Sequence, residues 1–266
     1  MEGDLIYRME EGLAVITLNR PTVLNALNRA MVAEIRDIAR RIEKDPDVFA
    51  LAITGTGRGF CSGHEIQAVL AATLEGAGTP APDAQELPAL FSFLLRISKP
   101  VFAALNGVSA AGGFVLAMMC DMRIASEAAS FTVGFSNRGL VAEHGLSWLL
   151  PRQIGTSRAL DLLWSSRRIS AAEALRIGLV DRVVEAGKEL EEVAIYVREL
   201  RAKTSPRALA EIKAQVYAHL SADFVTAVMD SERRTKLSLT HSDVREGALA
   251  FIERRPPRFQ PWMCDE

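Results

Sequence analysis

The sequence predicts an α/β core followed by a region built only of helices. Two observations lead to this prediction. Short β-branched apolar segments alternate with amphipathic segments of helical period up to about Val184. After that residue the apolar side chains recur at helical spacing, which is typical of an appended helical region. We therefore expect a core over residues 1–200 and a helical region over residues 201–266.

The composition limits the classes of protein to which the chain can belong. Its 266 residues are 49% hydrophobic and 24% charged, an ordinary soluble composition. The net charge of −2 gives no indication of a nucleic-acid partner or of an anionic membrane partner. The three cysteines have no CxxC spacing, so we expect a reduced intracellular compartment, the cytoplasm. The sequence predicts neither a signal peptide nor a membrane span.

The N-terminal part predicts two strands with a helix between them. Leu13–Arg20 is β-branched and apolar and ends before a proline, so we expect a strand. Residues 26–47 place apolar side chains on one helical face, and Phe49–Gly57 reads as a second strand that ends in glycines. Ala68–Glu86 is rich in Ala, Gly, Pro and Thr, and a mobile loop and a weak helix are equally good readings of it.

The central part continues the alternation of strands and helices. Val101–Gly107 predicts a third strand, and Phe114–Asp121 is apolar on all sides, which indicates a buried helix. Met122–Glu127 and Ser130–Val133 predict further short strands. Ser170–Gly178 has a serine N-cap, a glutamate three residues later and a closing glycine, the pattern of a capping-box helix.

Several sequence patterns point away from other kinds of site. A dinucleotide-binding fingerprint would need a third glycine where Phe60 stands, and a nucleophile elbow around Ser109 would need glycine in place of Ala111. The four histidines have no metal-binding spacing. His64 lies in a glycine-flanked loop, where an imidazole is by default structural or solvated.

Two glycines and one glutamate suggest a site instead. Gly112 and Gly113 precede the predicted buried helix, so their N–H groups can point at a developing negative charge, as in half of an oxyanion hole. Glu143 lies in the apolar stretch 138–155, where a carboxylate is costly unless it is paired or used. The alternatives for Glu143 are a solvated loop position or an ion pair with Arg138 or Arg152.

Five segments, taken in chain order, resemble the crotonase (enoyl-CoA hydratase/isomerase) superfamily. They are Asn19–Asn28, Gly57–Ile66, Lys99–Phe131, Ile169–Val184 and Ser242–Phe259. The resemblance implies a superhelical spiral of ββα turns and a C-terminal helical trimerisation region, assembled as a homotrimer or hexamer. It also implies an acyl-CoA thioester as substrate, with coenzyme A as part of that substrate and no other cofactor.

The resemblance also assigns roles to residues. The backbone N–H groups of His64 and Gly112 would hold the oxygen of a thioester enolate. Main-chain groups around Ser62, His64 and Ile66 would contact the coenzyme A. Hydratases of the family carry two catalytic glutamates, and the equivalent positions here hold Val115 and Phe135.

Enoyl-CoA isomerases of the family have a single acidic residue in a G-L-x-x-[ED]-x-G pattern, and Gly139–Gly145 matches it with Glu143. We therefore expect an isomerase in which Glu143 shuttles a proton, with an acyl pocket around Val115, Phe135 and Trp148. One alternative is a hydratase or thioester hydrolase that uses Glu143 with His144 or Glu65. Another is an acyl-CoA-binding assembly module without turnover.

Overall fold

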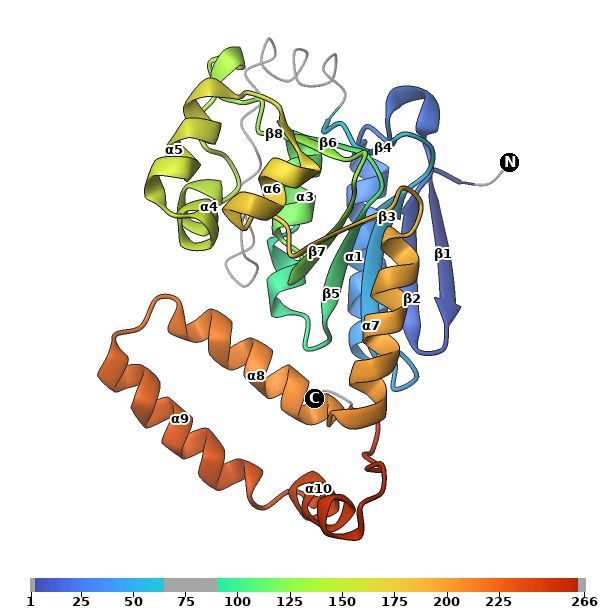
Figure 1. The fold of residues 1–266 in the computed structure, drawn as a ribbon, viewed down its shortest axis with the longest axis vertical. Helices are drawn as coiled ribbons and strands as arrows, with labels where there is room; N and C mark the ends of the chain where they lie inside the picture. The colour runs from blue at the N-terminus through green and yellow to red at the C-terminus, as the bar shows by residue number, and fades with distance from the viewer. Residues whose placement is uncertain (1–2, 65–89, 263–266) are drawn as a thin grey trace.

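The computed structural model describes residues 3–64 and 90–262. Its strands form two sheets (Figure 1). The larger sheet has the order β1-β2-β3-β5-β7-β10, and only the β1–β2 pair is antiparallel. The smaller sheet has the order β4-β6-β8-β9. The strands are β1 Leu5–Glu10, β2 Leu13–Leu18, β3 Ala50–Gly55, β4 Gly59–Cys61, β5 Val101–Leu105, β6 Val108–Ala110, β7 Met122–Ser126, β8 Ser130–Thr132, β9 Ile169–Ser170 and β10 Arg182–Val184.

The chain repeatedly passes from a strand of the larger sheet to a strand of the smaller one. It does so from β3 to β4, from β5 to β6 and from β7 to β8, and β4, β6 and β8 run parallel to one another in the smaller sheet. The helices are α1 Arg29–Glu43, α3 Gly112–Met118, α4 Leu146–Ile154, α5 Thr156–Ser165, α6 Ala171–Ile177, α7 Glu189–Lys203, α8 Pro206–His219, α9 Phe224–Ser238 and α10 Ser242–Glu253, with short 3₁₀ turns η1 Pro21–Val23, η2 Ser92–Arg96 and η3 Ser136–Arg138. This ββα spiral with a helical C-terminal region is the predicted fold class.

Strand β2 shows why the larger sheet lies between two layers. All six residues of β2 are buried. Since alternate side chains of a strand face opposite sides of the sheet, both faces of the sheet must be covered at β2. Ile16 packs in the main core with α1, whereas Val15 packs in a second cluster with Val193 and Val197 of α7. The larger sheet is therefore covered on both faces, as expected for a mostly parallel sheet.

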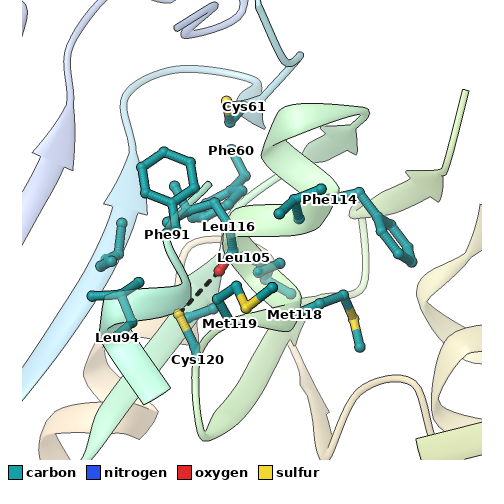
Figure 2. Packing of buried hydrophobic residues seen from close by; sticks show 14 of the residues in the cluster. Phe60, Cys61, Phe91, Leu94, Leu105, Phe114, Leu116, Met118, Met119 and Cys120 are labelled. Atoms are coloured by element: carbon teal, nitrogen blue, oxygen red, sulfur yellow. Dashed lines mark hydrogen bonds between the residues drawn. The ribbon is translucent and has the colours of Figure 1, made fainter. Parts of the chain in front are cut away.

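The predicted central helix is real, but it begins at Gly112 and ends at Met118. All seven residues of α3 are buried, and Figure 2 shows Phe114, Leu116 and Met118 packed among aromatic and aliphatic neighbours. Cys120 follows the helix and its thiol donates to the carbonyl of Leu116 at 3.4 Å. Burial raises the pKa of this thiol to about 12, so Cys120 is a neutral part of the core.

The helix predicted over Ser170–Gly178 has half of the expected capping box. The Ser170 hydroxyl accepts from the N–H of Glu173 at 3.2 Å, and Gly178 closes α6 in the left-handed region. The carboxylate of Glu173, however, binds the guanidinium of Arg167 at 2.7 and 3.0 Å. The salt bridge takes the place of the return bond to the N-cap.

The all-helical region begins after β10, as predicted. The predicted boundary at residue 200 falls in the last turn of α7, which continues to Lys203. Helix α8 is tied to the core by Lys213, whose ammonium reaches Asp121 at 2.7 Å and the carbonyls of Leu94 and Lys99. Within the described residues no helix is long and apolar enough to cross a membrane.

Candidate active site

Two turns from distant parts of the sequence meet at the start of α3. Gly63 follows β4 with φ +94°, and an added Cβ there would lie 2.9 Å from the Cβ of Ala111 and 3.0 Å from the amide nitrogen of Gly112. A side chain at Gly113 would lie 2.1 Å from the carbonyl oxygen of Cys61. The glycines therefore allow the two backbones to approach each other more closely than any side chain would permit.

Ala111 is the N-cap of α3 and has φ 46° and ψ −118°. A non-glycine residue at positive φ stores strain of about 1–3 kcal/mol and is over-represented at functional sites. Its N–H donates to the carbonyl of Thr132 at 3.3 Å, which ties the turn to β8. The turn is thus held in an unfavourable conformation by the smaller sheet.

The predicted donor groups lie on these two turns. Within the described residues, the N–H groups of His64 and Gly112 donate to no recorded protein acceptor. The neighbouring carbonyl of Gly63 is occupied by the N–H of Leu27 at 2.7 Å. An unpaired N–H at the start of a helix is suited to binding a negative charge. Among the described residues both N–H groups are therefore left available for a ligand, and an oxyanion hole formed by His64 and Gly112 stays a prediction.

Asn25 has a structural part in this site that the sequence did not suggest. Its side chain is fully buried and donates to the carbonyls of Gly59 at 2.7 Å and Thr56 at 3.0 Å, while its oxygen accepts from the N–H of Arg20. Asn25 therefore fastens the N-terminal segment to the turn between β3 and β4. In the sequence, the indication that Asn25 has a role is its place within Asn19–Asn28, one of the segments that resemble the family.

Three titratable side chains gather beside the two turns. Glu143 and His144 are adjacent, with 4.0 Å between Glu143 Oε2 and His144 Nε2, and His64 lies within electrostatic range of both. Burial raises the pKa of Glu143, and the nearby His64 partly offsets this rise. Burial also lowers the pKa values of His64 and His144. The cluster favours a carboxylate that holds a proton more readily than usual beside neutral imidazoles.

The alternative ion pairs for Glu143 are not recorded among the described residues. The Arg152 guanidinium stacks 4.1 Å from the centre of the Trp148 ring and donates to the Trp148 carbonyl. The Arg138 guanidinium lies beside Gly134. Glu143 is 34% exposed, so it is neither neutralised by arginine nor fully solvated.

His64 is exposed, which fits the default expectation of a solvated imidazole, but one edge of its ring lies at Gly112. An added Cβ at Gly112 would lie 3.0 Å from His64 Nδ1, so the imidazole lies against the backbone of the second predicted donor. The sequence could place His64 in a turn, but the position of its ring depends on how that turn packs on α3.

The predicted acyl-pocket residues have different environments. Val115 is 0% exposed and Phe135 is 4% exposed, so both belong to the main core. Trp148 instead lines a cavity of about 890 Å³ together with His144 and side chains of α8. This volume lies within the range of about 300–1,000 Å³ that is usual for ligand sites.

The predicted coenzyme A contacts are described only in part. The N–H of Ser62 donates to the carbonyl of Leu24, and its hydroxyl donates to the carbonyl of Val23. A main-chain contact from Ser62 to coenzyme A would therefore have to use the Ser62 carbonyl. Glu65 and Ile66 lie outside the described residues, as does the segment 68–86.

Two other kinds of chemistry find no support in the described part of the chain. Ser109 is fully buried and its hydroxyl donates to the carbonyl of Gly113 at 3.2 Å, so it is not placed as a nucleophile. No group of three or more metal-binding side chains occurs among residues 3–64 and 90–262.

Comparisons with known proteins agree with the resemblance seen in the sequence. Residues 8–261 match the family model for enoyl-CoA hydratase/isomerase. A probable enoyl-CoA hydratase of Rhodobacter capsulatus is 37% identical over 255 residues, which cover 95% of this chain and 96% of the relative. A 1,2-epoxyphenylacetyl-CoA isomerase of Escherichia coli is 33% identical over 261 residues, with 96% and 97% covered.

A solved structure gives the same result for the fold. The crystal structure of an enoyl-CoA hydratase from Polaromonas sp. JS666 superposes with a TM-score of 0.88 at 31% identity, covering 97% of this chain and all of that one. The resemblance is thereby confirmed over nearly the whole length. The chain belongs to the enoyl-CoA hydratase/isomerase family.

Proposed function

We propose that the protein is an enoyl-CoA isomerase that moves a double bond from the 3 to the 2 position of an acyl-CoA thioester. The observation that carries this proposal is a carboxylate, Glu143, whose pKa is raised by burial, together with two backbone N–H groups, of His64 and Gly112, that have no protein acceptor among the described residues. Both positions at which the family's hydratases carry glutamate hold buried apolar side chains, Val115 and Phe135.

The reaction needs only one base. Ionised Glu143 removes a proton from C2, and the electrons of the broken C–H bond pass to the thioester oxygen. The N–H groups of His64 and Gly112 stabilise this enolate oxygen. The enolate then collapses, C4 takes the proton back from Glu143, and a double bond forms between C2 and C3. Atoms and charge balance without water.

The direct test is product analysis. Purified protein is incubated separately with a 3-enoyl-CoA and with a 2-enoyl-CoA, and the products are identified by chromatography and mass spectrometry. The proposal predicts conversion of the 3-enoyl to the 2-enoyl thioester, with little 3-hydroxyacyl-CoA from either substrate. Rapid addition of water to the 2-enoyl thioester, with no isomerisation, would overturn it.

Hydration is the second candidate, and two observations favour it. The Rhodobacter relative is named as a hydratase, and His64 and His144 supply extra proton-carrying groups beside Glu143. In this case Glu143 and one imidazole would hold the attacking water. The same product analysis separates the two reactions, because hydration adds the mass of one water.

We also propose that the chain assembles as a trimer or hexamer through its C-terminal helices. Helix α9 exposes large apolar side chains that a monomer would leave in water, namely Phe224, Val225, Val228 and Met229. Exposed apolar patches of this kind mark interaction surfaces.

A further inference from the structure

His144, the residue after Glu143, is held in an unusual backbone conformation. Its φ of 55° lies in the left-handed region, and Gly145 follows it with φ 79°. A non-glycine residue in this region is strained, and the strain persists only where the surrounding structure enforces it. Adjacent side chains of an extended chain point to opposite sides. The turn therefore allows the two side chains to lie together, with 4.0 Å between Glu143 Oε2 and His144 Nε2.

A hydrogen bond at the other ring nitrogen determines where His144 carries its proton. The N–H of Leu90 donates to His144 Nδ1 at 3.3 Å. A nitrogen that accepts a hydrogen bond holds no proton, so the neutral ring carries its proton at Nε2. Burial lowers the pKa of His144, which favours this neutral form. The ring thus has its N–H at the nitrogen that lies nearer to the Glu143 carboxylate.

We propose that His144 is a positioning residue for Glu143, with its Nε2–H donating to one oxygen of the carboxylate while the other oxygen carries the proton. This inference rests on the proposed function, since it takes Glu143 to be the base. The distance of 4.0 Å exceeds a hydrogen bond, and a rotation of the carboxylate closes it when a thioester occupies the site. His144 itself neither gains nor loses a proton in the reaction.

The other ionisable groups around His144 leave it as the neighbour of Glu143. His144 is 30% exposed and lines the cavity of about 890 Å³. The ionisable side chains on the other walls of this cavity are Glu43, which accepts from the N–H of Ser98, Lys213 and Tyr217, which bind Asp121, Glu211, which binds Arg234, and the exposed Arg96. His64 lies within electrostatic range of the pair. Among the described residues, the recorded ion-pair partner of Glu143 is His144.

Two amide variants separate the two hydrogen bonds of the ring. The amide of asparagine takes the place of Nδ1, so His144→Asn can still accept from Leu90 but has no donor at the Nε2 position. The amide of glutamine reaches the Nε2 position, so His144→Gln restores a donor to Glu143 and loses the bond from Leu90. Asparagine also suits a left-handed backbone better than glutamine does, so a purely structural role of His144 would favour His144→Asn.

The measurement is the pH dependence of kcat/KM between about pH 5 and pH 9, for the enoyl-CoA reaction that the wild type catalyses. In His144→Asn the ionised carboxylate loses a donor, so the pKa of Glu143 rises further and the acid limb moves to higher pH. The plateau value should fall about tenfold, the effect of losing one hydrogen bond to a charged group. His144→Gln should keep the wild-type acid limb and most of the plateau value. The control is His241→Asn, in the N-cap position of α10 with no side-chain cap, and it should change neither quantity.

A double variant tests whether His144 acts through Glu143. Once Glu143→Gln has removed the base, adding His144→Asn should cause little further loss, because the hydrogen bond no longer has a carboxylate to position. Losses that simply add would mean that His144 acts independently of Glu143, and the inference would be wrong.

The inference and the proposed function can fail separately. If His144→Asn is as active as His144→Gln and has the same acid limb, the ring is only structural and the inference fails, while Glu143 remains the base. If Glu143→Gln keeps wild-type activity, the proposed function fails and the inference fails with it.

Discussion

Adjacent glycines at the start of α3 illustrate how single atoms decide the geometry of the site. A side chain at Gly113 meets backbone, the carbonyl of Cys61 at 2.1 Å, whereas one at Gly112 meets the end of a side chain, the ring of His64 at 3.0 Å. Backbone in a sheet cannot move aside, but an imidazole can rotate. The two positions should therefore differ in what a substitution damages.

We expect Gly113→Ala to destabilise the fold by about 1–3 kcal/mol or more, as overpacking does. The Gly112→Ala variant should keep most of the wild-type stability. Its kcat/KM should fall, because the added methyl group displaces the ring of His64 and crowds the oxyanion position. Thermal unfolding and steady-state kinetics measure the two effects. Equal thermal stability of the two variants would contradict this account of the turn.

The pH dependence of the wild type follows from the raised pKa of Glu143. Only the ionised carboxylate can accept the C2 proton, so kcat/KM should be low under acidic conditions and rise with pH through the pKa of this group. Because burial raises that pKa, the rise should occur above the usual range for a glutamate. A profile that is flat across this range would show that another group is the base.

The sequence names candidate residues for the site but not their contacts. Glu143, His64 and Gly112 could be named because short motifs fix their positions along the chain. The ring of His64 could not be placed, because its contact with Gly112 requires two turns from different strands to pack together. Burial of Val115 and Phe135 in the core likewise depends on the whole assembly of sheets and helices.

At the scale of elements, the attachment of α8 depends on one buried polar cluster. Lys213 has three recorded acceptors, and the Asp121 carboxylate also accepts from the N–H of Val101 and the hydroxyl of Tyr217. The side chain of Lys213 is only 9% exposed and that of Asp121 18%. The cluster fixes the helix that forms one wall of the cavity beside Trp148.

Lys213→Met should therefore destabilise the protein by about 3 kcal/mol, the lower end for breaking a buried pair because Asp121 keeps some exposure. Urea unfolding measures this loss. The matched control is Lys188→Met, which breaks the exposed pair with Glu191 and should leave the midpoint almost unchanged. If both variants unfolded at the wild-type midpoint, α8 would be held by other contacts.

Most strands and helices with a clear apolar period were predicted, and so was the short strand β8, but strand β1, with exposed side chains along most of its length, was missed. Helix α1 and strands β2, β3 and β5 have enough residues for their apolar period to be read. Strands β4, β6 and β9 have only two or three residues, so no period can emerge from them. Gly112 and Gly113 were expected to precede the buried helix, whereas they form its first two residues, where Gly113 permits close contact with β4.

At the scale of the whole molecule, assembly depends on the exposed apolar face of α9. Val225→Asp combined with Met229→Asp places two charges on this face and should shift a trimer or hexamer towards monomer, as measured by light scattering at micromolar concentration. Glu34→Lys, an exposed charge change on α1, should leave the assembly intact. A monomeric wild type would contradict the proposed assembly.

The central claim is that Glu143 carries the proton in a site that stabilises a thioester enolate. The most direct measurement is the rate of 3-enoyl-CoA isomerisation by wild type and by Glu143→Gln, with thioester binding measured in parallel by calorimetry. Glutamine keeps the shape of the side chain but cannot accept the proton, so kcat should fall by about 10²–10⁴-fold while the dissociation constant changes little. Isomerisation at the wild-type rate by Glu143→Gln would contradict the account.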